Sequence, residues 1–333
     1  MDPITQGALG AVFSQTQSKK TTLAKAAVIG GLAAMAPDLD VFIRSASDPL
    51  LALEFHRHFT HSLFFIPIGA LICSFVLHPL LGRRWNVSYS LSLWWCFLGF
   101  ATHALLDGCT SYGTQLLWPF SDQRFAWDTV SVVDPLVTLP LLICVYLANK
   151  RRTRAPAILG MAWLLIYLSF GYVQQQRAQD IAQELAEQRG HQPSRLEVKP
   201  TFGNLIIWKS IYLNDGRFYI DAIRPGLSEG KIWAGESIAK LELSTQMLWL
   251  DKQSQQGLDV ARFTWFSDHY VAIDAQDANR IVDVRYSMLP QNIAPLWGIQ
   301  LSPSADNNSH VEYFTQRSNS LQALQRLLAM LVE

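Results

Sequence analysis

Long apolar runs dominate the first half of the chain and predict membrane-spanning helices. A helix that crosses a bilayer needs about 20 mostly apolar residues. Residues 62–81, 89–106, 132–148 and 156–173 meet this demand or come close to it. A fifth run, residues 23–36, is rich in alanine and glycine, and small residues suit a helix that packs closely against other membrane helices. The pattern predicts an α-helical integral membrane domain of about five spans.

Lysine and arginine gather in three short segments between the predicted spans. They are Lys19, Lys20 and Lys25 before the first span, Arg83 and Arg84 between the second and third, and Lys150, Arg151, Arg152 and Arg154 between the fourth and fifth. Cytoplasmic loops carry an excess of such residues. With all three segments in the cytoplasm, five spans alternate without conflict. Residues 1–17 are too short to span as a helix, at about 1.5 Å per residue, so they are expected at the interface or as a re-entrant half-helix.

The character of the chain changes after the last predicted span. Residues 174–189 are polar, with Ile181 and Leu185 one helical turn apart, and predict a helix that continues out of the membrane. Short β-rich runs follow at 195–198, 204–213, 217–223, 247–250, 260–266, 281–288, 296–301 and 310–314. The Asn-Asp-Gly sequence at 214–216 is a strong hairpin signal, and residues 320–332 have the period of an amphipathic helix. The predicted parts are a membrane domain (1–175), a helical connector (176–193) and a β-rich soluble domain outside the cytoplasm (194–333).

Composition excludes several classes of protein. The 333 residues include 27 Lys and Arg and 27 Asp and Glu, so the formal net charge is zero and no basic surface argues for a nucleic-acid partner. The four cysteines form no CxxC pair, so neither a disulfide framework nor a cysteine zinc site is indicated. Asp2 stands where a signal peptide carries positive charge. Membrane insertion is therefore expected to rest on the internal segments.

Acidic and histidine side chains punctuate the ends of the apolar segments. They are Asp38 and Asp40 in PDLD, His56 and His61 in HRHFTHS, His103 and Asp107 in HALLD, and Asp134. The predicted topology puts all seven at the outer face of the membrane. Ionisable groups are costly there and usually mark an ion site, a proton path or a catalytic centre. A mixture of aspartate and histidine is ligand chemistry suited to a divalent metal.

Each of these motifs also has a simpler interpretation. The two carboxylates after Pro37 can converge on one cation, or they can cap a surface turn. The histidines of HRHFTHS can be ligands, or neutral imidazoles at a membrane boundary. His103 and Asp107 have the i, i+4 spacing by which zinc helices present two ligands, but they can also hydrogen-bond within the helix. Asp134 precedes Pro135 and suits a helix N-cap.

Two arginines and an aromatic loop complete the candidate site. Arg57 and Arg124 are the cations nearest the acidic and histidine motifs. Either can hold an anionic substrate group such as phosphate, and either can pair with a local aspartate. Asp128 is interpreted as a loop residue. The aromatic side chains of residues 111–127 predict a membrane-interface belt, which can also line an entry for a lipid-like substrate.

A set of spaced motifs, taken in order, resembles a known family. The motifs are MDPITQGALG at the start, PDLD at 37–40, HRHFTHS at 56–62, HALLD at 103–107, TSYGT at 110–114 and PFS at 119–121. In these the chain resembles the YdjM-like family of bacterial membrane-bound metal-dependent hydrolases, over about the first 175 residues. The resemblance implies a ligand set of Asp38, Asp40, His56, His61, His103 and Asp107, with His58 at a variable position. Many relatives carry Thr-His near the start, whereas this chain has Thr5-Gln6, so the resemblance carries no ligand to Gln6.

Two hypotheses of function follow. The first is a multi-pass metal-dependent hydrolase at the outer face of the bacterial inner membrane, with zinc as the expected ion and Asp40 or Asp107 as general base. Its substrate would be amphiphilic, a phosphoester or lipid-like molecule, and membrane lipids would be its partners. The second is a non-enzymatic membrane protein, either a metal-ion transporter or a scaffold whose outer domain binds a partner. The apolar interiors of residues 64–77 and 136–145 argue against transport.

Overall fold

The computed structural model describes residues 1–226, 230–316 and 320–333. The chain folds into two compact units. The first, here called the helical unit, comprises Met1–Ile43, Phe55–Val173 and Phe202–Leu205. The second, the sheet unit, comprises Arg44–Glu54, Gln174–Thr201 and Ile206–Glu333. A helical N-terminal region followed by a sheet-rich C-terminal region is the order that the sequence predicts.

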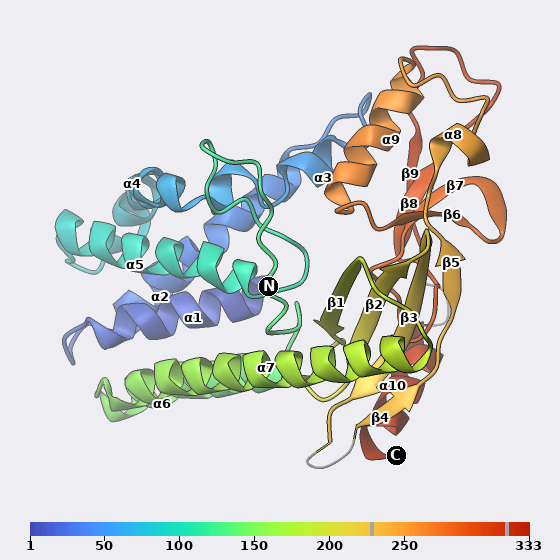
Figure 1. Cartoon of the computed structure of the whole chain (residues 1–333). Helices are drawn as coiled ribbons and strands as arrows, with labels where there is room; N and C mark the ends of the chain where they lie inside the picture. The colour runs from blue at the N-terminus through green and yellow to red at the C-terminus, as the bar shows by residue number, and fades with distance from the viewer. Residues whose placement is uncertain (227–229, 317–319) are drawn as a thin grey trace. The chain divides into compact units, whose positions relative to one another are not determined.

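The helical unit is built from helices joined by short turns at α1–α2, η4–α5 and α6–α7 and by longer segments at residues 36–65 and 109–134 (Figure 1). Its α-helices are α1 (Pro3–Thr16), α2 (Leu23–Met35), α4 (Ile66–Leu77), α5 (Tyr89–Gly108), α6 (Pro135–Arg151) and the first part of α7 (Ala155–Gln188). Short helices of other types join or extend them: η1 (Ala36–Phe42), η2 (Phe59–His61), η3 (Leu63–Phe65) and the π-helix η4 (His78–Gly82). The five-residue α3 (Leu51–Phe55) lies where the chain passes between the units.

Three helical stretches in the described part of the chain are long and apolar enough to cross a membrane. They are Leu63–Gly82, Tyr89–Gly108 and Ala155–Gln188. The other two predicted spans form shorter helices, of 13 residues in α2 and 17 in α6. Pro37 follows the end of α2, and Asp134 caps the start of α6 through a hydrogen bond from the Leu136 backbone N–H at 3.0 Å. The total of five spans therefore stays a prediction.

Small residues let the first helices pack backbone against backbone. A Cβ atom added at Gly99 of α5 would overlap the carbonyl oxygen of Gly30 in α2, and one at Gly10 of α1 would overlap Ala34. Close approach through glycine and alanine is typical of helices packed within a membrane. α1 contacts α2, α5 and α6, so residues 3–16 lie within the bundle. This packing fixes the end of α2 beside α5, where the candidate site lies.

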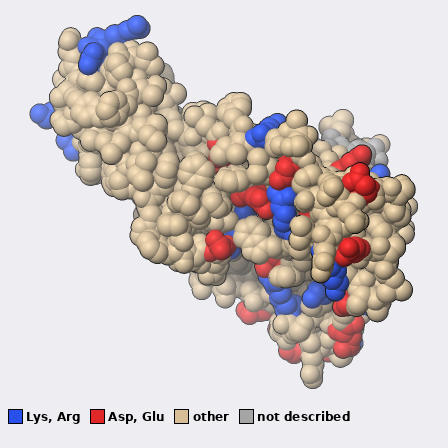
Figure 2. Space-filling model, turned by 90° about the horizontal axis from the view of Figure 1, so that it is seen from above, with Lys and Arg blue, Asp and Glu red and all other residues tan. Residues whose placement is uncertain are grey.

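The surface of the helical unit is apolar along the helices and charged near its ends. Phe75, Leu139 and Leu165 are large apolar side chains that stand exposed on α4, α6 and α7. Figure 2 shows this part as a largely uncharged surface with Lys and Arg gathered at one end. In Figure 1 the turns α1–α2, η4–α5 and α6–α7, which carry the basic segments, lie together at one end of the unit. Which end faces the cytoplasm stays a prediction.

The sheet unit contains two antiparallel sheets. The first has the order β1 (Arg195–Pro200), β2 (Trp208–Asn214), β3 (Arg217–Arg224) and β4 (Lys231–Trp233), with β5 (Ser237–Ala239) also paired to β3. The second has the order β6 (Val271–Asp274), β7 (Asp277–Asp283), β8 (Trp297–Gln300) and β9 (Glu312–Thr315). The predicted hairpin is confirmed, because Asn214 pairs with Arg217 and both loop residues have positive φ.

Two predicted strands of this unit are wrong. Residues 260–266 lie in helix α9 (Gln255–Phe266), and residues 247–250 follow the short helix α8 (Leu243–Gln246) as a turn. The β-branched and aromatic side chains of 260–266 favour a strand locally, but Val260, Phe263 and Phe266 are buried at helical spacing, and the Ser254 side chain caps the helix. The amphipathic helix predicted for 320–332 is α10 (Ser320–Val332).

Candidate metal centre

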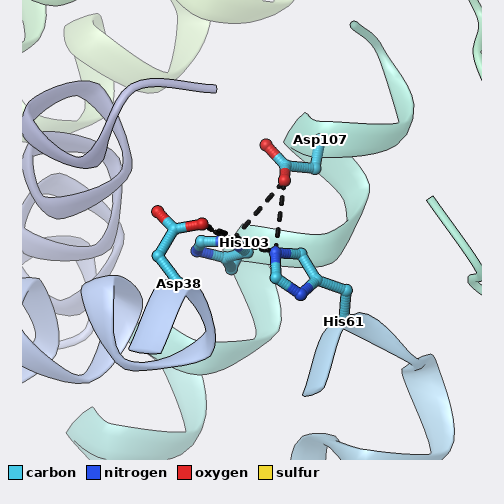
Figure 3. Close-up of side chains that lie close together, drawn as sticks. All are labelled: Asp38, His61, His103 and Asp107. Atoms are coloured by element: carbon cyan, nitrogen blue, oxygen red, sulfur yellow. Dashed lines mark hydrogen bonds and ion pairs between the residues drawn. The ribbon is translucent and has the colours of Figure 1, made fainter. Parts of the chain in front are cut away.

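Four side chains from three separate segments converge within the helical unit. Asp38 lies on η1, His61 ends η2, and His103 and Asp107 are one turn apart on α5 (Figure 3). One ligand atom from each lies within 4.8 Å of those from the other three. Both histidines and Asp107 are fully buried, whereas the Asp38 side chain is 16% exposed. The group therefore has one side open to solvent, at Asp38.

The separations among these atoms are of the size expected around one bound cation. The two imidazole Nε2 atoms are 2.8 Å apart. Asp38 Oδ1 lies 3.6 Å from His61 Nε2 and 3.4 Å from His103 Nε2, and Asp107 Oδ2 lies 3.3 and 3.7 Å from the same two atoms. Around a zinc ion with bonds of about 2.0–2.1 Å, tetrahedral ligand atoms stand about 3.3–3.4 Å apart. The four histidine–aspartate distances, 3.3–3.7 Å, lie at or somewhat above this value, and the Nε2–Nε2 distance of 2.8 Å lies below it.

The second nitrogen of each imidazole sets its tautomer. His103 Nδ1 lies 2.6 Å from the carbonyl oxygen of Ala34, and His61 Nδ1 lies 3.0 Å from Thr60 Oγ1 and 3.3 Å from Asp40 Oδ2. The Ala34 carbonyl can only accept. The Thr60 hydroxyl donates to Asp40 Oδ2 at 3.2 Å and therefore accepts from His61. Each Nδ1 thus carries the proton, and each Nε2 presents a lone pair to the centre. Metal-binding histidines are oriented by such partners on their other nitrogen. Two lone pairs 2.8 Å apart repel each other unless a cation or a shared proton lies between them.

Asp107 is the most heavily contacted member of the group. Its carboxylate forms an ion pair with the Met1 amino group and accepts from Gln6 Nε2 at 2.8 Å. Arg57 Nε lies 3.0 Å from its second oxygen, and Arg57 Nη1 donates to Thr110 Oγ1 at 2.7 Å. Arg57 is buried, so it acts as the counter-charge of a buried carboxylate. Gln6 therefore has a structural role here, which no local sequence pattern indicates.

Asp40 and His56 lie next to the cluster but outside the group of four. Asp40 Oδ1 is 2.9 Å from His56 Nδ1, and Asp40 Oδ2 accepts from the backbone N–H of Arg57 at 2.9 Å. Burial alone would raise the pKa of the Asp40 carboxyl, but these hydrogen bonds hold that pKa below its usual value. Asp40 is therefore a charged group that orients His61 through its Nδ1.

The remaining candidates have other partners. Arg124 Nη2 donates to the carbonyl oxygen of Gly113 at 2.9 Å, and its guanidinium lies 5.6 Å from the centre of the Tyr112 ring. The Arg57 guanidinium lies 4.9 Å from the same ring. Asp134 is the N-cap of α6 and accepts from the Tyr167 hydroxyl at 2.8 Å. Asp128 is buried in the loop before α6.

Comparisons with known proteins agree with a membrane protein. The model of the family described as YdjM inner membrane protein matches residues 1–178. Inner membrane protein YbcI of Escherichia coli (strain K12) is 38% identical over 109 residues, which are 31% of this chain and 60% of YbcI. Uncharacterized protein YfhP of Bacillus subtilis (strain 168) is 24% identical over 277 residues, 79% of this chain and 78% of YfhP. The chain thus spans about three fifths of the length of YbcI. No solved structure matches.

The apolar helices and the buried polar cluster at their ends define a helical membrane protein. The family match covers more than half of the chain, and its residues include every member of the cluster. The chain belongs to the YdjM inner membrane protein family.

Proposed function

We propose that the helical unit binds a divalent cation, zinc being the best fit, and uses it to hydrolyse a phosphoester. The observation that carries the proposal is the close approach of two imidazole Nε2 atoms and two carboxylates to one point. Asp38 Oδ1 faces the two imidazoles, whereas Asp38 Oδ2 is buried and has no hydrogen-bond partner in the described structure.

The chemistry assigned to each side chain follows from its contacts. A divalent cation bound here would lower the pKa of a water molecule and polarise a phosphoester oxygen. His61 and His103 are held as neutral ligands by Asp40 and by a backbone carbonyl. Asp38 Oδ2 has no hydrogen-bond partner in the described structure, and the Asp38 side chain as a whole is 16% exposed, so Asp38 is the proposed general base. Asp40 takes a positioning role, because its oxygens are already engaged.

An amphiphilic substrate suits the surroundings of the centre. Leu39 stands between the two aspartates of η1 and is 60% exposed, and Phe42 ends the same helix with 77% exposed. Phe64 and Phe120 are also exposed and pack edge to face, with ring centres 4.8 Å apart. Exposed large apolar side chains beside a polar site mark contact with a lipid or an apolar ligand. This surface favours a phosphoester that carries an apolar chain.

The direct test is metal analysis combined with an activity assay. Full-length protein purified in detergent is expected to contain about one zinc ion per chain, because the four ligand atoms form a single close group and zinc takes four ligands. It is also expected to hydrolyse bis(p-nitrophenyl) phosphate or a short-chain phospholipid. Chelation should abolish turnover, and added zinc should restore it. Bound zinc without turnover on any phosphoester of the panel would count against hydrolysis and favour the scaffold hypothesis.

Asp40→Asn is expected to weaken zinc binding without removing a ligand. The amide can still accept a hydrogen bond but loses the negative charge that polarises His61, and loss of such an outer partner typically costs about 10–100-fold in metal affinity. Competition with a fluorescent zinc chelator measures the change. Asp122→Asn, which alters an exposed aspartate of the same unit, is the matched control. Equal affinities for the two variants would contradict the positioning role of Asp40.

A further inference from the structure

The chain between two ligands of the metal centre leaves the helical unit. Asp38 precedes this segment and His61 follows it, and both belong to the helical unit. Residues Arg44–Glu54 between them belong to the sheet unit. We call Arg44–Glu54 the ligand loop, because whatever holds it also limits the movement of the residues at its two ends.

One arginine of the sheet unit holds the ligand loop at two points. Arg262 lies on α9, and its Nη2 and Nη1 donate to the two carboxylate oxygens of Asp48 at 2.8 and 3.1 Å. Its Nε donates to Glu54 Oε1 at 2.6 Å. A guanidinium presents its donors in a rigid fork, so a bidentate pair fixes the orientation of the carboxylate as well as its position.

The Arg262 side chain is itself fixed from within its own helix. Asp259, one turn earlier on α9, accepts from Arg262 Nη1 at 2.9 Å. The Asp259 carboxylate is buried, lies 2.8 Å from His310 Nδ1 and accepts from the backbone N–H of Val311 at 3.2 Å. The guanidinium is therefore held on both sides, and the ligand loop is attached to an ordered part of the sheet unit.

The attachment points are close to the metal centre along the chain. Glu54 stands two residues before His56 and seven before His61. Because a residue spans at most about 3.6 Å, a shift of Glu54 cannot be absorbed in the single residue before His56. His56 in turn contacts Asp40, which orients His61. Movement of the ligand loop is thus expected to displace His56, and through its contact with Asp40 to displace His61.

We propose that Arg262 is a positioning residue of the metal centre, and that it holds the ligand loop in the conformation in which Asp38 and His61 face a common point. The inference rests on the metal-binding part of the proposed function. Its physical basis is preorganisation, because a loop that is already fixed loses less conformational entropy when the cation binds. Arg262 then affects the metal affinity through the ligand loop.

The contacts of Arg262 with Asp48 and Glu54 are here called the clamp. The test compares the zinc affinity of full-length protein with and without the clamp. Arg262→Gln is expected to weaken zinc binding by about 10–100-fold, as losses of groups that orient ligands do. The visible spectrum of the cobalt-substituted protein should also change, because the ligand geometry relaxes. Arg280→Gln is the matched control, since Arg280 bonds to Gln300 and Asp277 within the sheet unit. It should leave both the affinity and the spectrum unchanged.

A second variant guards against a folding defect in the sheet unit. The double substitution Asp48→Asn and Glu54→Gln removes the carboxylates of the ligand loop and keeps the pair of Arg262 with Asp259. It should reproduce the affinity loss and the spectral change of Arg262→Gln. Combining it with Arg262→Gln should add little, because both changes break the same interaction.

The outcomes separate the inference from the proposed function. Wild-type zinc affinity and an unchanged cobalt spectrum in both clamp variants would overturn the role of Arg262 and leave the metal centre standing. Failure of the wild-type protein to bind zinc would overturn the proposed function, and the inference with it. Weaker binding in both clamp variants, with wild-type affinity in Arg280→Gln, would support the inference.

Discussion

Replacing His61 or His103 by alanine is expected to abolish stoichiometric zinc binding and all hydrolysis that depends on it. Each imidazole supplies one of four ligand atoms in a closely spaced set, and no other imidazole of the group can take its place. A lost ligand should lower zinc affinity by at least about 100-fold, more than the 10–100-fold typical of outer-shell partners. Metal content after dialysis, measured by mass spectrometry, gives the result directly.

His58→Ala is the control for these two substitutions. His58 stands three residues before His61, but its ring packs against Phe55, Phe59 and Trp118 instead of joining the group of four. It should retain the metal content of the wild type. Equal metal in all variants, or none in the wild type, would show that the two imidazoles share a proton and not a cation.

Asp107→Asn is expected to cost both metal and stability. The substitution weakens a ligand, and it also removes the negative charge that faces Arg57, which is only 3% exposed. Breaking a buried ion pair by removing one partner costs about 3–5 kcal/mol, because the other charge stays buried without compensation. The free energy of unfolding in detergent should fall by this order. Labelling of the buried thiols of Cys73 and Cys96 during denaturation reports the unfolding.

Asp38→Asn separates the two effects of the Asp107 substitution. Asp38 is also a member of the group of four, but its carboxylate faces the two imidazoles and solvent. Asp38→Asn should therefore lose zinc with a much smaller loss of stability than Asp107→Asn. If the two variants unfold equally easily in the absence of metal, the pair of Asp107 with Arg57 does not stabilise the fold.

The sequence could predict which motifs approach the centre but not which side chains enter it. His103 and Asp107 share a helix face at i, i+4, so their convergence follows from helix geometry alone. His56 and His61 are separated by a turn in which Arg57 has a φ of 63°. This left-handed residue redirects the chain, so His61 points into the group while His56 meets Asp40. A non-glycine residue with positive φ leaves no clear mark in a sequence.

Local sequence patterns also could not predict the residues that surround the group of four. Gln6, Thr110 and the carbonyl oxygen of Ala34 belong to three different helices or their ends, and each contacts the centre or its arginine only after the bundle is packed. The clamp of Arg262 on the ligand loop joins residues more than two hundred positions apart. No spacing of residues along the sequence predicts such pairs.

The sequence by itself determined the apolar helices, the gathering of aspartate and histidine at helix ends, and the sheet-rich character of the last part. These properties depend on the period of side chains and on local turn chemistry, which neighbouring residues set. Tertiary structure alone decided that four of six candidate ligands share one point and that residues 260–266 form a helix. Both outcomes depend on which side chains become buried and which charges become paired. Burial and pairing are decided only when segments distant in the sequence pack together.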